Sequence, residues 1–258
     1  MRNFLLSLDS HAREVFLSIG MVFFLAIRGL HGVFTRPFDP GLVLQEADNI
    51  GTKSLFLVNT IALFSGMVLA LQGVYTMRRY GAELYVGSLV SLTLVRELGP
   101  VLTAIMVGGR AGSGMAAEIG SMQVTEQIDA MRALGANPVK KLVTPRMLAA
   151  MITLPLLTVS ADVVGIFGGL VIALIELPID TNFYLNTIWT TVTINDFLSG
   201  IGKTIFFGFL IALFGCYYGL YTKGGTTGVG RSTTMTVVTV SIAVLISDFF
   251  LTKIFLLF

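Results

Sequence analysis

Charge, cysteine and histidine are scarce in this sequence. Asp, Glu, Lys and Arg make up 12% of the 258 residues, against about 25% in an average soluble domain. The single cysteine, Cys216, excludes an intrachain disulfide, and two histidines far apart leave a metal site almost without ligands. The formal net charge of +2 is too small to indicate a nucleic acid partner. These shortages argue against a disulfide framework, a metal enzyme and a nucleic-acid-binding protein.

Apolar residues are abundant instead. They form 54% of the chain, so water is not its main solvent. A soluble nucleotide-binding domain needs on the order of 100–200 residues of its own, and the chain has no room for one beside a membrane domain. We expect one all-α polytopic membrane domain over residues 1–258. No catalytic residue and no metal ligand are predicted, and ATP with Mg²⁺ would belong to a separate partner ATPase.

Five apolar runs have the length of a membrane-spanning helix, which needs about 20 residues to cross a hydrocarbon core about 30 Å thick. Four of them contain at most two charged residues. The other contains the adjacent pair Arg96 and Glu97, and its flanks still match a span. The expected spans are Ser54–Met77, Tyr85–Val107, Met147–Ile175, Phe197–Tyr221 and Met235–Leu257.

The first 40 residues follow a different pattern. The apolar run Val15–Ile27 is too short to cross a membrane, and it follows the mixed pattern of Phe4, Leu5 and Leu8. This pattern is typical of an amphipathic helix that lies in the membrane interface. The alternative is a cleaved signal peptide, but no small-x-small cleavage site follows and the charged n-region would be unusually long.

Lysines and arginines collect on one side of the expected spans. With the N-terminus in the cytoplasm, most of them lie inside, and chiefly Arg78, Arg79 and Lys253 lie outside. Cytoplasmic loops carry an excess of Lys and Arg. We therefore predict a cytoplasmic N-terminus and, after five spans, a C-terminus on the far side of the membrane.

The segment Gly108–Arg146 joins the second and third expected spans. Glu118, Met122, Glu126, Ile128 and Met131 fit a short amphipathic helix, and the sequence from Gly135 to Pro138 ends it. A polar helix followed by a break between two spans offers a docking surface for a soluble protein. The other interpretation is a solvated loop whose charges only fix the topology.

Several motifs in and before this segment carry a family resemblance. Asp129-Ala130-Met131, followed by Gly135, is similar to the EAA-xxx-G signature of bacterial ABC importer permeases, with Asp in place of Glu and Met in place of Ala. A larger set of motifs resembles the MlaE permease family over nearly the whole chain. That set is Arg96-Glu97-Leu98-Gly99-Pro100, Gly109-Arg110-Ala111-Gly112, Ala117-Glu118-Ile119-Gly120-x-Met122 and Thr125-Glu126-Gln127.

The resemblance implies a function that composition does not show. It implies a homodimeric permease in the bacterial inner membrane, within an ABC transporter that moves phospholipids and maintains outer-membrane lipid asymmetry. The implied partners are a cytoplasmic ATPase, a STAS-domain subunit and a periplasmic ring of MCE-domain subunits. The residues expected to couple to the ATPase are Glu118, Gly120, Met122, Glu126, Gln127, Asp129, Ala130, Met131 and Gly135.

Charged residues inside the spans are the first candidates for lipid contact. An ionisable group at membrane depth costs about 2.5–3.5 kcal/mol and needs a partner or a watery cavity. Adjacent residues on a helix point about 100° apart, so Arg96 and Glu97 need other partners. One interpretation is headgroup recognition by Arg96 with Glu97 orienting it; the other is a clamp between helices. Lys203 could meet a phosphate, although snorkelling to the surface is the default.

The outer half of the first span is a second candidate. Its residues recur at helical spacing, and the stripe ends beside two arginines. Apolar members would suit acyl chains; the alternative is a packing face with an interfacial tyrosine. The members expected to bind lipid are Leu69, Gln72, Gly73, Thr76 and Tyr80.

Two other functional classes have weaker support. A proton- or ion-coupled secondary transporter could use Asp162 and Asp248, whereas a lipid-modifying enzyme would need an interfacial His/Asp/Glu cluster that the sequence lacks. Gly225–Ser232 matches the P-loop spacing with Arg in place of Lys, but we expect it to be a loop that links two membrane spans, without the preceding strand and following soluble helix that a P-loop needs. Gly165, Gly168 and Gly169 are expected to let helices pack closely.

Overall fold

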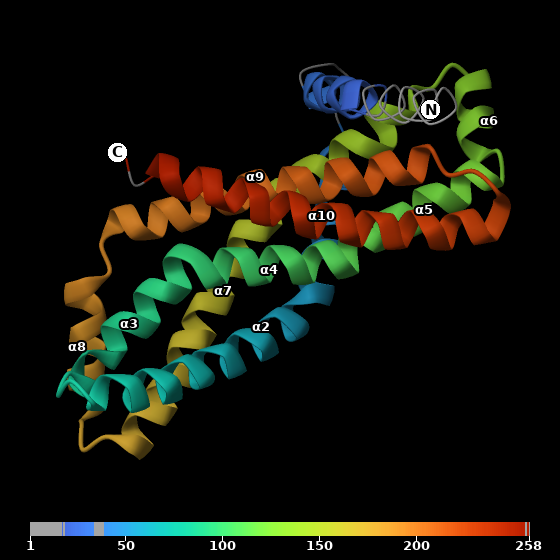
Figure 1. Ribbon diagram of the computed structural model, residues 1–258. Coiled ribbons are helices and arrows are strands. Elements are labelled where there is room, and N and C mark those ends of the chain that lie inside the picture. Colours follow the sequence, from blue (N-terminus) through green and yellow to red (C-terminus); the bar gives the residue numbers. More distant parts are fainter. Residues whose placement is uncertain (1–16, 18, 34–38, 256, 258) are drawn as a thin grey trace, which may run out of the picture.

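The computed structural model describes residues 17, 19–33, 39–255 and 257. Every regular element in that part of the chain is a helix, and five helical segments are long and apolar enough to cross a membrane. With the shorter N-terminal helix Ile19–Val33, they confirm the predicted all-α membrane fold (Figure 1). The five are α2 (Pro40–Arg78), Glu83–Val124, Val139–Glu176, α9 (Ile194–Leu220) and α10 (Gly225–Phe255).

Two of these segments are built from several helical pieces. The second runs through α3 (Val86–Thr93), α4 (Gly99–Val107) and α5 (Ser113–Val124), and the third continues into α7 (Thr144–Glu176). The pieces are connected by wider, π-helical turns, which are frequent at functional sites. These turns are Leu94–Leu98, Gly108–Gly112 and Val139–Val143.

The helices extend beyond the predicted apolar runs. Helix α2 begins at Pro40 instead of Ser54, and α10 begins at Gly225 instead of Met235. At the start of α2, Oδ1 of Asp39 accepts a hydrogen bond from the Gly41 amide at 2.9 Å, as an N-cap residue does. Hydropathy marks only the part of a helix that needs lipid, whereas backbone hydrogen bonds continue the helix into its polar flanks.

Glycines let α2 and α7 approach each other closely. A Cβ atom on Gly66 of α2 would overlap the carbonyl oxygen of Gly165, and one on Gly168 would overlap that of Leu63. Gly169 lies in the same stretch of α7 and would crowd Val90 of α3. The prediction that these glycines permit close packing is confirmed at Gly165, Gly168 and Gly169.

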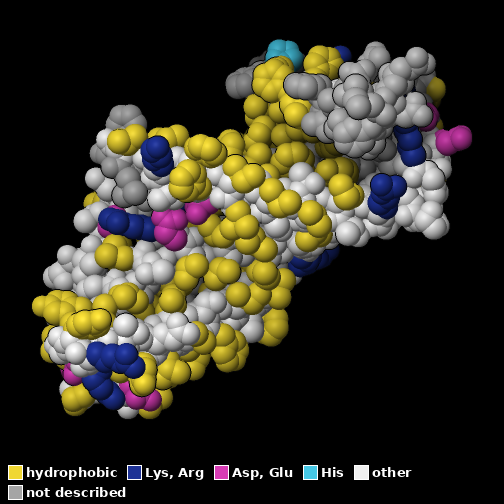
Figure 2. Space-filling view, viewed as in Figure 1, with side chains coloured by type: hydrophobic (Ala, Val, Ile, Leu, Met, Phe, Trp, Pro, Cys, Tyr) yellow, Lys and Arg dark blue, Asp and Glu magenta, His cyan; other side chains and the backbone are white. Residues whose placement is uncertain are grey.

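Hydrophobic side chains both fill the core and cover much of the outer surface. A buried core of Met147, Leu154, Phe207, Ile211 and neighbouring residues joins α7 to α9. Large apolar side chains also remain exposed along the spans, and Figure 2 shows them over the middle of the visible face, with most charged groups near its ends. An outer surface of this kind suits a lipid solvent.

Two short helices mark opposite ends of the bundle (Figure 1). Helix α6 (Gln127–Ala133) follows α5 at one end, and α8 (Thr181–Thr191) precedes α9 at the other. Tyr184 anchors α8: its side chain is buried beside Gly87 and Gly169, and burial raises the pKa of its hydroxyl to about 12. These two ends are called the α6 end and the α8 end below.

The N-terminal helix Ile19–Val33 lies at the α6 end (Figure 1). Its buried glycines face the start of α7: the Gly29 carbonyl accepts a hydrogen bond from Thr144 Oγ1 at 3.0 Å, and Gly32 contacts the same residue. Phe23 and Phe24 on its other face are exposed. The helix continues to Val33, beyond the predicted end at Ile27, and Phe4, Leu5, Leu8 and Val15 lie outside the described residues.

Candidate functional site

A polar cavity opens among the second span, α9 and α10 toward the α8 end. Its volume is about 540 Å³, within the range of small-molecule binding sites. Basic and acidic side chains meet there in an otherwise apolar part of the bundle. The lining residues are Leu92, Thr93, Arg96, Glu97, Thr193, Asn195, Asp196, Ser199, Lys203, Thr252 and Phe255.

The π-helical turn Leu94–Leu98 places Arg96 and Glu97 in this cavity. Proline has no backbone N–H, so Pro100 leaves the Arg96 carbonyl without its usual helical donor. The Gly99 amide donates to the Leu94 carbonyl, five residues back, and Lys203 Nζ donates to the free Arg96 carbonyl at 3.0 Å. The Gly-Pro pair therefore explains both the widened turn and the acceptor that Lys203 uses.

Lys203 is buried at the centre of an ion-pair network. Its side chain is 2% exposed, and Nζ lies 2.8 Å from Glu97 Oε2, 2.6 Å from Thr252 Oγ1 and 3.1 Å from Asp248 Oδ1. Hydrogen bonds to Glu97, Thr252 and the Arg96 carbonyl use the three protons of the ammonium group, and Asp248 adds an ion pair. The expectation that Lys203 snorkels to the surface is therefore wrong, because α9 meets acidic partners on the second span and on α10.

Arg96 pairs with Asp196 instead of Glu97. Arg96 Nε donates to Asp196 Oδ1 at 2.7 Å, and Nη2 forms an ion pair with the same oxygen. Glu97 is engaged by Lys203 and Thr252, so the prediction that Glu97 orients Arg96 is wrong. The Arg96 side chain remains 44% exposed, and its other N–H donors are available to the cavity.

The stripe predicted on the outer half of α2 divides into two parts. Gly73 is buried at van der Waals distance from Val86 and Leu89 of α3, and Leu69 is half-buried against the same core. Gln72, Thr76 and Tyr80 are exposed, Tyr80 by 82%. Packing therefore accounts for Gly73 and Leu69, and the exposed members face outward from the single chain.

At the α6 end, the predicted amphipathic helix is two helices. Helix α5 carries Glu118, Gly120 and Met122 as an extension of the second span, and α6 is separate. The chain turns at Glu126, whose φ of 60° is left-handed. One continuous helix through Glu118 and Met131 is therefore wrong, since the turn at Glu126 redirects the chain out of the span.

Helix α6 is held by one buried side chain and a regular C-terminal cap. Ile128 is fully buried. Gly135 adopts φ +77°, and the Ala136 amide donates to the Met131 carbonyl at 2.9 Å, which is the Schellman pattern. Gly120 is also buried and close to Thr222, while Met122 and Met131 are half-buried. The exposed members of the predicted coupling set are Glu118, Glu126, Gln127, Asp129, Ala130 and Gly135.

The P-loop-like sequence has no phosphate-binding geometry. Gly225–Ser232 forms the first turns of α10, not a loop between spans as expected, and no strand precedes it in the described part of the chain. Among the described residues, no group of three or more His, Cys, Asp or Glu side chains could hold a metal ion.

Comparison with known proteins identifies the family. The family model for the permease MlaE matches residues 43–254, from the first span to the last. The chain belongs to the MlaE permease family. It is 39% identical to a probable ABC transporter permease protein of Rickettsia typhi over 94% of each chain.

Two further relatives of this MlaE family member have more specific names. It is 33% identical to the intermembrane phospholipid transport system permease protein MlaE of Haemophilus influenzae over 98% of this chain and 97% of that protein. It is 37% identical to the chloroplastic protein TRIGALACTOSYLDIACYLGLYCEROL 1 of Arabidopsis thaliana over 82% of this chain and 61% of that protein. The chain is thus a multi-pass inner-membrane protein of the transporter-permease kind.

Sequence reasoning missed two charged residues of this MlaE permease. Asp196, the partner of Arg96, also completes a capping box with Thr193 at the start of α9; the Thr-x-x-Asp spacing was a usable signal. From the sequence, Arg146 was predicted only to be one of the Lys and Arg residues on the cytoplasmic side. Its side chain is 3% exposed, and Nη2 lies 3.0 Å from Glu46 Oε1 and 2.9 Å from Glu118 Oε1. Arg146 therefore links α2, α5 and α7.

Proposed function

We propose that this chain is the membrane permease subunit of an ATP-driven ABC transporter that moves phospholipids between the inner and outer membranes and maintains outer-membrane lipid asymmetry. The α6 end would be cytoplasmic, with the N-terminus, and the C-terminus would be periplasmic. Support comes from membership of the MlaE permease family and the phospholipid-transport name of the Haemophilus relative. The observation that carries the proposal is the polar cavity with its half-exposed Arg96.

The cavity suits a headgroup because of how its charges are arranged. Lys203 is neutralised by Glu97 and Asp248, and it stabilises the wall of the cavity. Arg96 is fixed by Asp196 through one edge of its guanidinium group. Its remaining N–H groups can donate to a phosphate, which arginine binds with charge-assisted hydrogen bonds. The proposed lipid contact is therefore Arg96, with Gln72, Thr76 and Tyr80 beside a second protomer of the proposed homodimer.

The proposed ATPase contact is the exposed surface of α6. Glu126, Gln127, Asp129 and Ala130 are exposed there, and Ile128 fixes the helix to the bundle. The partner would carry ATP and Mg²⁺ and close on ATP binding. The proposed assembly also contains a STAS-domain subunit and a periplasmic MCE-domain ring.

A secondary transporter that uses Asp162 and Asp248 is less well supported. Asp248 faces Lys203 at 3.1 Å, so its charge is compensated in place. Asp162 is buried on α7 against Gly99. A relay needs acids that face each other or a shared watery path, and these two residues contact different neighbours.

The decisive experiment is a native pull-down of the full chain followed by lipid mass spectrometry. We expect an ATPase and phospholipid to co-purify. Arg96→Gln should lower the bound phospholipid about tenfold, since it removes a charged hydrogen bond worth about 1.5–3 kcal/mol. Lys253→Gln, a charge change at an exposed residue near the same end, should leave bound lipid unchanged. Transport by the chain without any ATPase would overturn the proposal.

A further inference from the structure

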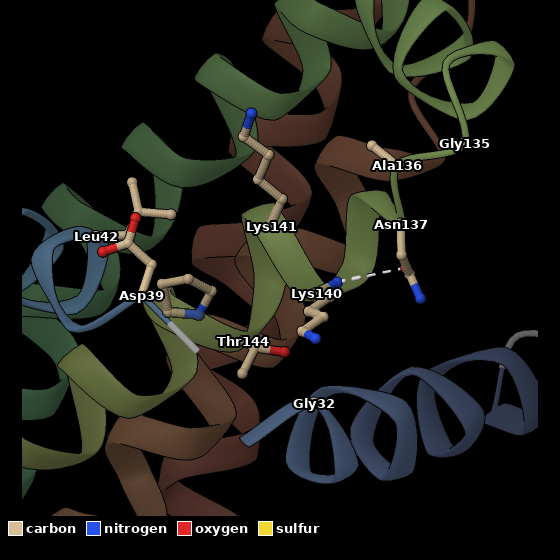
Figure 3. Close-up of a pocket in the computed structure, with 10 residues that line it drawn as sticks. Gly32, Asp39, Leu42, Gly135, Ala136, Asn137, Lys140, Lys141 and Thr144 are labelled. Atoms are coloured by element: carbon tan, nitrogen blue, oxygen red, sulfur yellow. Dashed lines mark hydrogen bonds between the residues drawn. The ribbon is translucent and has the colours of Figure 1, made fainter. Parts of the chain in front are cut away.

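A second cavity lies at the α6 end, between the N-terminal helix and the start of the third span (Figure 3). Its volume is about 450 Å³. It is separate from the polar cavity near the α8 end, and the proposed transport path does not use it. Its walls are Gly32, Asp39, Leu42, Gly135, Ala136, Asn137, Lys140, Lys141, Thr144 and Pro145.

The cations of this cavity differ from the basic groups of the spans. Arg96, Arg146 and Lys203 each face a carboxylate. Lys140 and Lys141 form no ion pair within the described part of the chain, and their ammonium groups donate no hydrogen bond there. Among the lining residues that the structure describes, Asp39 is the one carboxylate, and it caps the first turn of α2. The lining therefore carries more positive than negative charge.

The local backbone holds these lysines in place. Asn137 Oδ1 accepts hydrogen bonds from the amides of Val139 at 3.0 Å and Lys140 at 3.4 Å. This cap starts the π-helical turn Val139–Val143, on which both lysines lie. In Figure 3 the Lys140 side chain runs toward Thr144, and Lys141 extends to the opposite side of the same turn. Two cations thus stand on a short, capped turn at the cavity wall.

The rest of the lining is suited to an amphipathic ligand. Leu42, Ala136 and Pro145 supply apolar walls beside the lysines. The adjoining N-terminal helix exposes Phe23 by 68% and Phe24 by 53%, which such a helix buries in the acyl boundary of a membrane. The cavity therefore lies where a membrane surface would meet the protein.

We propose that this cavity binds the phosphate group of an anionic phospholipid in the leaflet that meets the α6 end. Lys140, whose side chain runs toward Thr144, supplies the contact with the phosphate, and Lys141 on the opposite side of the turn adds positive charge that attracts an anionic membrane surface. The apolar walls receive the adjoining part of the lipid. A bound lipid would contact three segments at once: the turn after α6, the end of the N-terminal helix and the start of α2. This site does not depend on the transport proposed above, because its ligand is a resident of the leaflet and not the cargo of the outer cavity.

The test uses the full chain with its co-purifying partners in nanodiscs of phosphatidylcholine, with or without phosphatidylglycerol. Lysines are modified with an amine-reactive reagent and quantified by peptide mass spectrometry. We expect phosphatidylglycerol to lower modification of Lys140 and Lys141 several-fold and to leave Lys223, an exposed lysine after α9, unchanged. Equal modification in both lipids would overturn the proposal.

A second arm measures bound lipid by native mass spectrometry. Lys140→Gln with Lys141→Gln should reduce retained phosphatidylglycerol about tenfold, since each basic residue near a membrane adds to anionic lipid attraction. The control, Lys223→Gln with Arg231→Gln, removes the same charge at the α9–α10 turn and should retain it. Thermal melting checks that both variants fold. The labelling experiment uses the protein without substitutions, so its result does not depend on the folding of either variant.

Two further outcomes identify a different ligand. Protection of Lys140 by inorganic phosphate in pure phosphatidylcholine would make the site one for free phosphate and would overturn the lipid assignment. Protection in pure phosphatidylcholine only when the ATPase is present would assign the lysines to a protein contact. Unchanged bound phospholipid in Arg96→Gln, with intact protection of Lys140, would refute the outer site alone.

Discussion

Lys203 illustrates how a single basic residue in an apolar run acquires its role from the fold. Sequence alone leaves snorkelling and phosphate binding open, because both explain one lysine near a span end. The structure gives it Glu97 from the second span and Asp248 from α10. Neither contact could be read from spacing, since the three residues lie on three helices whose rotations are set by packing.

Removal of the Lys203 charge should destabilise the protein strongly. Lys203→Met leaves Glu97 and Asp248 facing each other without a cation, and loss of one partner of a buried pair costs about 3–5 kcal/mol. We expect a lower melting temperature in detergent, measured by intrinsic fluorescence. Glu97→Gln and Asp248→Asn added to Lys203→Met should recover part of the loss. A melting temperature equal to that of the unmodified protein would show that the network is not structural.

The helices themselves were largely predictable, and their junctions were not. Hydropathy marked four spans, because a run of about 20 apolar residues is stable in lipid and not in water, and the flanks of the run that contains Arg96 and Glu97 marked the fifth. Hydropathy did not find the π-helical turns. The turn Leu94–Leu98 depends on the missing backbone N–H of Pro100, and the turn Val139–Val143 depends on the cap that Asn137 provides. The turn at Glu126 was missed for a similar reason, because glutamate rarely adopts a left-handed backbone conformation and the residue type therefore does not indicate a turn.

Close packing between α2 and α7 predicts a specific cost for one methyl group. Gly66→Ala would place a Cβ atom on the Gly165 carbonyl, so backbone must shift; we expect a loss of about 2 kcal/mol or more. Gly230→Ala on α10 has open space around its Cβ position and should be neutral or stabilising by up to about 1 kcal/mol through helix propensity. Chemical denaturation of the two variants compares them, and equal stability would contradict the close approach.

The cap of α6 predicts a functional effect at Gly135. Gly135→Ala strains a left-handed position by about 1–2 kcal/mol, and it loosens the C-terminal end of the proposed ATPase contact. Gly81→Ala creates the same strain at φ +66° near the α8 end, where α6 is remote. We expect Gly135→Ala to lower lipid-stimulated ATPase activity of the purified assembly several-fold and Gly81→Ala to leave it unchanged. Similar ATPase activity in both variants would show that the C-terminal cap of α6 does not contribute to coupling with the ATPase.

At the scale of the whole molecule, the two charged clusters are connected by continuous helix. The second span runs from Glu83 to Val124, and it carries Glu97 in the Lys203 network and Glu118 in the Arg146 cluster. Movement of α6 would thus reach the polar cavity through one segment with two π-helical turns. Such turns are weaker points of a helix, so they are where the segment would bend during transport.

Arg146 is the residue through which that movement would spread to α2 and α7. Glu118→Gln removes the α5 contact, while Glu46 still pairs with Arg146, so the fold should survive. We expect ATP hydrolysis to continue and lipid transported per ATP to fall about fivefold or more, as for a coupling free energy of about 1–3 kcal/mol. Glu126→Gln, at the exposed turn before α6, is the matched control for removal of a carboxylate and should weaken ATPase binding instead. If Glu118→Gln transported normally per ATP, the Arg146 cluster would be a static support, and coupling would have to pass through the α6 contacts alone.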